Sequence, residues 1–252
     1  MSSKGALVVF GSGPGIGRST AAYFSEKGFK HIILLSRDAS RLAEDAKFVS
    51  AAASDAKVET LKIDLAADEG AIKSVLQEVD GKLKAAGVPL EVVLYNAARV
   101  GPSKVLEWEA KRLEEDIRIT TISLYITLQW AIPQLLATAK SESYNPAFLT
   151  TSGGLYRDPY PHFFSLAASK ASQHNLMYSF YKKYEPQIHL ACMPVNGIVR
   201  DDAKVTSSRA VAAQFWKQYE QKKGVKGDFS VEMDDPDYED MVEGVRKMVD
   251  GE

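Results

Sequence analysis

The chain has 252 residues with a formal net charge of −2, and 45% of its residues are hydrophobic and 25% charged. These values are typical of a globular domain that buries a large core. The near-neutral charge argues against nucleic acid or an anionic membrane surface as a partner, because both need clustered Lys and Arg. The lone cysteine, Cys192, lies in an apolar run and fits a reducing compartment. With no signal peptide and no apolar run near the ~20 residues that span a bilayer, we expect a cytoplasmic protein.

Short apolar runs alternate with longer amphipathic segments along the chain. The runs predict buried strands at Ala6–Phe10, Ile32–Ser36, Val58–Ile63, Val92–Tyr95, Ala147–Thr151 and His189–Met193, with a short seventh at Phe229–Met233. The longer segments predict helices over Ile16–Lys27, Ser40–Ala53, Glu69–Ala86, Leu106–Ala139 and Phe164–Tyr184. This alternation indicates a Rossmann-type doubly wound α/β fold, with a parallel sheet of about seven strands and helices on both faces. We expect a single domain over residues 1–252.

A Gly-rich loop follows the first predicted strand directly. Gly11, Gly15 and Gly17 form the pattern G-x-x-x-G-x-G, and a helix is predicted to begin within it. Glycine tolerates a positive φ and lets a pyrophosphate approach the backbone, while the helix start offers unpaired N–H groups to that anion. A purely structural turn is the alternative. We predict a dinucleotide site that uses Gly11, Ser12, Gly13, Gly15, Ile16 and Gly17.

The end of the second predicted strand, Ser36-Arg37-Asp38, bears on the choice of dinucleotide. An acidic residue at this place accepts hydrogen bonds from the ribose 2′-OH of NAD(H). An arginine instead offers a planar fork of donors that suits a 2′-phosphate. Ser36 and Arg37 therefore favour NADP(H) as the cofactor. Two alternatives remain: Asp38 is placed to take the NAD(H) role, and Arg37 is an ordinary surface arginine.

Two stretches near the C-terminus depart from the alternation. Residues 200–228 are polar except for an aromatic patch at Phe215, Trp216 and Tyr219. Their place after the sixth strand suggests a substrate lid, and a solvated helical hairpin is an equal alternative. Residues 234–252 are predicted to end the chain as a helix. The acidic residues at its start favour the positive end of the helix dipole, which indicates capping and not a metal site.

Further motifs follow the later strands, in Asp64-Leu65, Asn96-Ala97-Ala98, Ser152, Ser169-Lys170-Ala171 and Asn196-Gly197-Ile198-Val199. Together with the glycine spacing, they resemble the motifs of the short-chain dehydrogenase/reductase family over nearly the whole chain. The resemblance implies cofactor contacts at Asp64, Leu65, Asn96, Ala97, Ala98, Lys170 and Val199. It also implies a catalytic serine at Ser152 and a lysine, Lys170, that holds the nicotinamide ribose. A small-molecule substrate and a homodimer or homotetramer are implied as well.

Three positions depart from that family's pattern. Leu166 stands four residues before Lys170, where the family has its catalytic tyrosine, and leucine cannot donate a proton. Thr120 stands near the place of the family's asparagine, and Phe10 replaces the threonine that opens the Gly motif. The stretch Thr151–Leu155 resembles an atypical branch of the family whose members also carry a leucine before the lysine.

Without that tyrosine, three kinds of function stay open. Tyr160, held between two prolines, is our candidate for a substitute acid, and Tyr156 and His162 lie in the same loop. A protonated imine needs no proton donor at oxygen. A protein that only binds NADP(H), as a sensor, a scaffold or a catalyst of a non-redox rearrangement, is the third option. We favour an NADP(H)-dependent reductase of a C=O or C=N group in a small hydrophobic molecule, with Ser152, Lys170 and Tyr160 as its catalytic residues.

Overall fold

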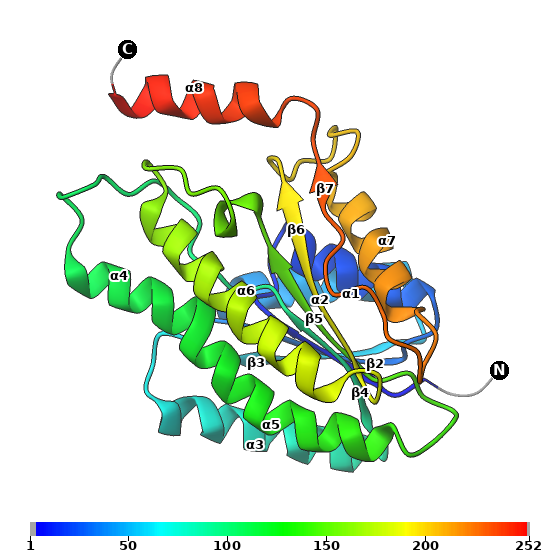
Figure 1. Ribbon diagram of the computed structural model, residues 1–252. Coiled ribbons are helices and arrows are strands. Elements are labelled where there is room, and N and C mark those ends of the chain that lie inside the picture. The colour runs from blue at the N-terminus through cyan, green and yellow to red at the C-terminus, as the bar shows by residue number, and fades with distance from the viewer. Residues whose placement is uncertain (1–3, 251–252) are drawn as a thin grey trace.

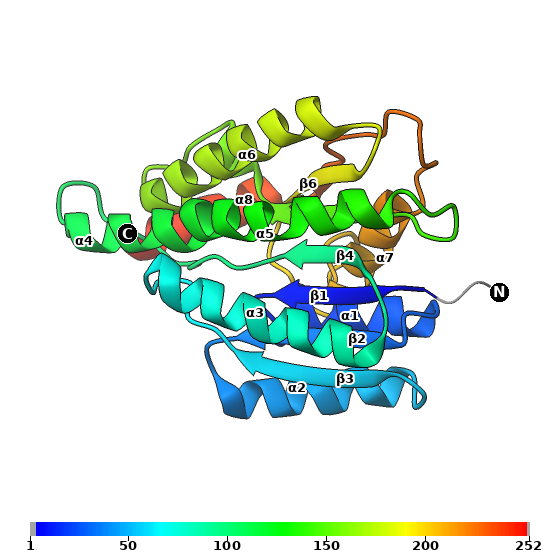
Figure 2. The ribbon, with the colours of Figure 1, turned by 90° about the horizontal axis from the view of Figure 1, so that it is seen from below.

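Seven parallel strands form the central sheet of the computed structural model, which describes the backbone of residues 4–250 and the side chains of residues 4–244 and 247 (Figure 1). The strands lie in the order β3-β2-β1-β4-β5-β6-β7, and Figure 2 shows β1, β3 and β4 running in the same direction. They are β1 (Ala6–Phe10), β2 (His31–Ser36), β3 (Lys57–Lys62), β4 (Leu90–Tyr95), β5 (Ala147–Ser152), β6 (His189–Asn196) and β7 (Met233–Asp234). The predicted Rossmann-type α/β fold is confirmed.

Helices cover both faces of the sheet. One hydrophobic core joins the sheet to α1, α2 and α7, and a second core joins it to α3, α5 and α6 on the opposite face. The helices are α1 (Ile16–Glu26), α2 (Ala39–Ala52), α3 (Glu69–Ala86), α4 (Ala110–Ile117), α5 (Ser123–Thr138), α6 (Phe164–Tyr184), α7 (Ser208–Tyr219) and α8 (Tyr238–Asp250). The strand order reverses between β1 and β4. In such sheets, ligands bind at this point, outside the carboxyl ends of the strands.

The predicted helix over Leu106–Ala139 is wrong in its first residues and is not uniformly α-helical. Leu106 has a φ of 68°, a left-handed conformation that a right-handed helix does not contain, and α4 begins four residues later. A π-helical turn, Arg118–Ile122, joins α4 to α5. In contrast, α3 has the bounds that the sequence predicts, because Asp68 caps its start and Gly87 ends it at a φ of 66°.

The predicted strand Phe229–Met233 is wrong in its bounds. The carbonyl of Phe229 accepts a hydrogen bond from the N–H of Cys192 at 2.8 Å, and Met233 pairs with Val195. In a parallel pair an N–H bonds to the carbonyl one residue before its Cα partner, so this bond places Cys192 beside Ser230, in the same register as Val195 beside Met233. The regular strand β7 is nevertheless confined to Met233–Asp234.

The aromatic patch that suggested a lid is buried in the core instead. Phe215, Trp216 and Tyr219 lie on α7 and are 0%, 8% and 1% exposed. Trp216 and Tyr219 pack edge-on and tilted against Phe24, which lies on α1, and Phe29, which follows α1. Because α7 packs along α1 on the same face of the sheet (Figure 1), these aromatic residues belong to the core that α1 and α7 share.

The last helix, α8, lies beyond the carboxyl ends of the strands, at the top of Figure 1. Its first turn holds Glu239 and Asp240, at the positive end of the helix dipole, as the sequence predicts. Within residues 4–250, every helix is too short or too polar to cross a membrane.

Candidate active site

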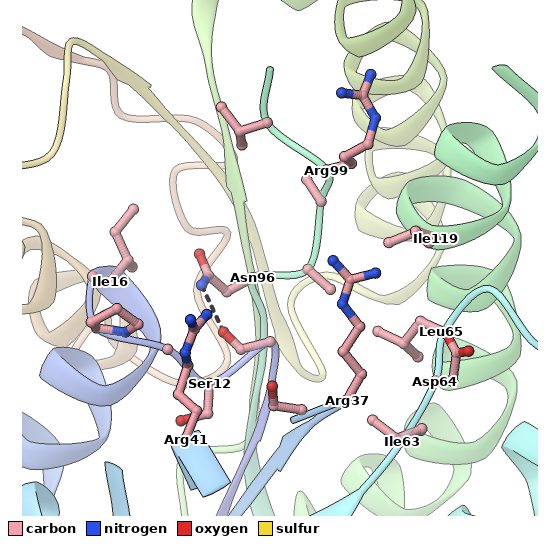
Figure 3. A pocket seen from close by; sticks show the side chains of 18 of the residues that line it. Ser12, Ile16, Arg37, Arg41, Ile63, Asp64, Leu65, Asn96, Arg99 and Ile119 are labelled. Carbon is pink, nitrogen blue, oxygen red and sulfur yellow. Dashed lines mark hydrogen bonds between the residues drawn. The ribbon is translucent and has the colours of Figure 1, made fainter. Parts of the chain in front are cut away.

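Two adjoining cavities lie at the carboxyl ends of the strands. The first has a volume of about 380 Å³ and is bordered by the Gly-rich loop, the ends of β2 and β3 and the segment after β4 (Figure 3). The second has a volume of about 410 Å³ and is bordered by the end of β5, the start of α6, the segment after β6 and α8. They share five lining residues, which are Ile16, Asn96, Ala98, Val100 and Val199.

The Gly-rich loop is shaped by close backbone contacts. Gly11 has a φ of 81°, and the N–H groups of Gly11 and Ser12 both donate to the carbonyl of Leu35, at 2.9 and 3.0 Å. A Cβ on Gly17 would lie 2.6 Å from the Gly11 carbonyl oxygen, so this position has no room for a side chain. Gly17 therefore sits behind the loop, where it allows α1 to approach, and it does not line the first cavity.

The outer side of the same loop is open. A Cβ on Gly13 or Gly15 would meet no atom within 4 Å, and both residues line the first cavity. The start of α1 has no side-chain cap and no acidic residue in its first turn. Its N–H groups and the positive end of its dipole are thus available to an anion. This open, uncapped cradle fits the pyrophosphate of a dinucleotide.

Asn96 joins the loop to two strands of the sheet. Its amide nitrogen donates to the Gly11 carbonyl at 2.9 Å, the dashed line in Figure 3, and its amide oxygen accepts from the Thr151 hydroxyl at 3.0 Å. The residue therefore ties the ends of β1, β4 and β5 together and faces both cavities.

Two arginines border the far side of the first cavity. Arg37 and Arg41 line it from the end of β2 and the first turn of α2 (Figure 3). Both are exposed, and within the described part of the chain neither forms an ion pair. Asp38, the alternative considered for an NAD(H) role, does not line the cavity. Its carboxylate caps α2 by accepting from the N–H groups of Ser40 and Arg41 at 3.0 and 3.1 Å, and the Ser40 hydroxyl holds its pKa below the usual value.

The structure brings most of the predicted cofactor residues together around the first cavity. Those that line it are Gly11, Ser12, Gly13, Gly15, Ile16, Ser36, Arg37, Asp64, Leu65, Asn96, Ala97, Ala98 and Val199. Lys170 lines the second cavity instead. Thr120 is buried in the π-helical turn and lines neither cavity.

Lys170 is the buried cation of the second cavity. It is 7% exposed, and its Nζ donates to the Thr151 carbonyl and to the Gln173 Oε1 atom, both at 3.0 Å. Burial lowers its pKa to about 8, because the charged form loses hydration. Leu166 lies one turn earlier on α6 and also faces this cavity. The cation therefore has an aliphatic neighbour at the place where the family resemblance expects a phenol.

Two further hydroxyls reach the second cavity. The Ser152 hydroxyl is buried at the end of β5, and within the described residues it has no hydrogen-bond partner of normal geometry. Tyr160 lines the cavity and packs beside His162, with 5.3 Å between ring centroids. Neither His162 nor Tyr156 is among the described lining residues. Tyr156 turns away and stacks on His174 at 4.0 Å.

Sequence reasoning missed the wall that α8 contributes. Tyr238, Met241 and Val242 line the second cavity, at positions three and four residues apart on one face of the helix. The spacing of these three residues is the signal in the sequence that could have identified this wall. The aromatic patch of Phe215, Trp216 and Tyr219 is absent from the described lining, and the face of α8 lines the cavity instead.

Residues 5–209 match the family described as short chain dehydrogenase. The chain is 28% identical over 237 residues to the WW domain-containing oxidoreductase of Danio rerio, an alignment that covers 85% of this chain and 55% of that protein. The chain thus spans about half the length of this relative.

Solved structures share the fold. An alcohol dehydrogenase from the archaeon Thermococcus sibiricus, complexed with 5-hydroxy-NADP, has a TM-score of 0.78 at 16% identity, over 92% of this chain and 97% of that one. A metagenomic short-chain oxidoreductase in complex with NADP has a TM-score of 0.76 at 19% identity, over 91% and 96%. An NADPH dependent reductase involved in bacilysin biosynthesis has a TM-score of 0.79 at 15% identity, over 92% and 97%.

Proposed function

Because the chain belongs to the short chain dehydrogenase family, we propose that it is an NADP(H)-dependent oxidoreductase that reduces a C=O or C=N group of a small hydrophobic molecule. The observation that carries the proposal is the pair of joined cavities. The first holds an open Gly-rich cradle and is lined by three arginines, of which Arg99 is paired with Asp116 while Arg37 and Arg41 form no ion pair in the described chain. The second is mainly apolar and contains Ser152 and Lys170. A dinucleotide in the first cavity would present its reactive end to a substrate in the second through the lining that they share.

The arginines support NADP(H) as the cofactor. A 2′-phosphate is an anion that a guanidinium binds through two parallel hydrogen bonds. Arg37 and Arg41 face the first cavity without a carboxylate partner in the described chain, while Asp38 is engaged in capping α2. A free ribose 2′-OH therefore finds no acceptor from Asp38.

The lining of the second cavity supports a neutral, hydrophobic substrate. Among its described lining residues, Lys170 alone carries a charge. The described lining contains no arginine or histidine that could bind a carboxylate or phosphate group of a substrate. The apolar lining that a substrate would contact comes from two parts of the chain. Leu155, Phe163, Leu166 and Val195 lie within the residues that match the family, and Met241 and Val242 lie on α8.

The chain's own residues take three roles in this proposal. When bound, a dinucleotide would supply a hydride to the carbon of the C=O or C=N group. Lys170 would hold its ribose, and the Ser152 hydroxyl would donate a hydrogen bond to a carbonyl oxygen or accept one from the N–H of a protonated imine. For a carbonyl substrate, the Tyr160 phenol gives a proton to the oxygen, since Leu166 cannot. This is a non-standard active site, of the branch whose members carry leucine before the lysine.

The test is turnover of NADPH on a panel of neutral ketones, aldehydes and cyclic imines. The proposal expects loss of NADPH absorbance with at least one hydrophobic member. Tyr160→Phe should abolish carbonyl reduction and spare imine reduction, and Leu166→Tyr should raise carbonyl reduction. NADPH binding with no turnover on the whole panel would instead support a protein that binds NADP(H) without redox chemistry, which Leu166 also favours.

We also propose a cytoplasmic homodimer or homotetramer. Half-exposed apolar side chains lie on the π-helical turn, α5 and α6, at Ile122, Tyr125 and Tyr178, which are 43%, 43% and 39% exposed. Burial of such side chains between subunits would remove apolar area from water. Light scattering of the purified protein measures the mass, and a monomer at micromolar concentration would reject this part of the proposal.

A further inference from the structure

Asp45 is a buried carboxylate on α2, beneath the Gly-rich loop. We infer that it is a positioning residue of the dinucleotide site, which holds the loop in the shape that receives the phosphates. The inference rests on the proposed function for the identity of the ligand. Its grounds are the burial of Asp45, its two contacts and the place of those contacts in the loop.

The position of Asp45 is one where stability alone favours an apolar residue. The buried residues of α2 are Leu42, Asp45 and Val49, which lie three and four residues apart and form the face that enters the core. Asp45 is 0% exposed, as is Val49, and Leu42 is 2% exposed. A carboxylate placed there loses its hydration, and in other proteins the replacement of such groups by hydrophobic residues of similar volume is often neutral or stabilising.

The contacts of Asp45 only partly compensate that loss. Its Oδ2 atom accepts a hydrogen bond from the Ser12 hydroxyl at 2.8 Å. Its Oδ1 atom has no hydrogen-bond partner within the described residues and lies 3.6 Å from a guanidinium nitrogen of Arg18. Arg18, on the first turn of α1, stacks over the Phe48 ring of α2 at 4.6 Å. A buried carboxylate stabilises a fold only when a cation and hydrogen bonds satisfy both of its oxygens, and among the described residues Oδ1 of Asp45 lacks such a hydrogen bond.

The contact with Ser12 adds a side-chain hydrogen bond to a loop whose backbone is held at Gly11 and Ser12 by the Leu35 carbonyl. Residues 11–15 read G-S-G-P-G, so Ser12 has the loop's one polar side chain. Glycines on both sides leave the backbone free to adopt many conformations. The bond to Asp45 fixes Ser12, which lines the first cavity. Because Asp45 follows Arg41 by one turn of α2, the same bond sets the distance between the loop and the arginine that faces the 2′-phosphate position.

Two substitutions separate positioning from a structural role. Asp45→Leu removes the acceptor and places a larger apolar side chain on the face that holds Leu42 and Val49, while Asp45→Asn keeps the volume and an acceptor for the Ser12 hydroxyl. We expect Asp45→Leu to weaken NADPH binding about 10-fold, the effect of losing about one hydrogen bond, with a free energy of unfolding equal to or above that of the wild type. Asp45→Asn should bind NADPH within about threefold of the wild type. The readouts are equilibrium fluorescence titration and urea unfolding.

Two further variants complete the test. Val49→Ala destabilises the same helix face and controls for loss of stability, so it should leave the NADPH dissociation constant unchanged. Ser12→Ala should weaken binding as Asp45→Leu does, and the double variant should be no weaker than either, because both changes remove one contact. Wild-type affinity in Asp45→Leu, or an affinity loss in Val49→Ala that matches its stability loss, would overturn the inference.

Hydrogen exchange of the free protein distinguishes failure of this inference from failure of the proposed function. The amides of Ser12, Gly13 and Gly15 should exchange faster in Asp45→Leu than in Asp45→Asn, whatever ligand the loop binds. Equal exchange in the two variants would reject a role for Asp45 in the loop. Failure of the wild type to bind NADPH, with that difference in exchange present, would reject the cofactor assignment and leave the loop contact in place.

Discussion

Lys170 is a buried cation whose charge should destabilise the folded protein near neutral pH. Burial lowers its pKa from 10.5 to about 8, and the unfolded chain restores the higher value. Between these values the unfolded state holds more protons, so the free energy of unfolding rises as the pH rises from 8 to 10.5. Below pH 8 the full penalty is present. The substitution Lys170→Met removes this titration and keeps an unbranched side chain.

The size of the effect follows from the two pKa values. The fall from 10.5 to about 8 corresponds to a penalty of about 3 kcal/mol at pH 7, which shrinks to about 1 kcal/mol at pH 9.5. Lys170→Met also loses the hydrogen bonds to Thr151 and Gln173, but that loss does not depend on pH. The difference in unfolding free energy between the two proteins should therefore change by about 2 kcal/mol over this range.

Urea unfolding of both proteins at pH 7, 8, 9 and 9.5 measures this difference, and titrations common to both proteins cancel in it. Wild-type stability should gain on the variant as the pH rises. Lys140→Met, at an exposed site at the end of α5, is the matched control and should show no such trend. Parallel pH curves for the wild type and Lys170→Met would refute the reasoning, because they would show that the pKa of Lys170 is not lowered by burial.

Three further outcomes are expected. Gly17→Ala should lower NADPH affinity by about 100-fold or more in a fluorescence titration, since its Cβ would lie 2.6 Å from a carbonyl oxygen of the loop; unchanged affinity would count against the loop geometry. Arg37→Ala combined with Arg41→Ala should weaken NADPH by about 10- to 100-fold and leave NADH unaffected, and an equal loss for both would reject the 2′-phosphate role. Tyr219→Phe should lower the unfolding free energy by about 1–2 kcal/mol, because Glu91 loses a buried hydrogen bond at 2.7 Å, without changing NADPH affinity.

The strands were predictable because central parallel strands are buried along their whole length. In β1 and β4 every residue is buried, and such strands read as continuous apolar runs. The end of β6 was predicted too early, at Met193. The strand continues through Pro194, which pairs with Ser152, to Asn196. A proline usually argues against a central strand, so a prediction from local sequence ends the strand before Pro194.

The position of the site was predictable from topology. Residues that directly follow parallel strands meet at one edge of the sheet, and the Gly-rich loop, Arg37 and Asn96 meet there as expected. The structure adds that Asp38 caps α2, a contact that the sequence alone does not show. Asp38 can cap α2 only because the helix begins directly after it. The first residue of a helix is harder to predict from a sequence than the existence of the helix.

Contacts between distant segments were not predictable. The bond between Ser12 and Asp45 joins residues 33 positions apart. The spacing of Leu42, Asp45 and Val49 places Asp45 on the apolar face of α2, but it does not identify Ser12 as its partner. The aromatic residues of α7 are buried in the core, and the sequence left a lid open as one alternative because aromatic residues are common both in cores and around ligands. The wall formed by α8 depends on how the end of the chain folds back over the strands.

Equilibrium titration of the purified protein with NADPH and with NADH tests the central claim most directly. The loop Gly11–Gly17 together with Arg37 and Arg41 should bind one NADPH per chain, at least about 10-fold more tightly than NADH, which corresponds to about 1.4 kcal/mol. Binding of neither dinucleotide at millimolar concentration would contradict the account of the first cavity, and tighter binding of NADH would contradict the role given to the two arginines.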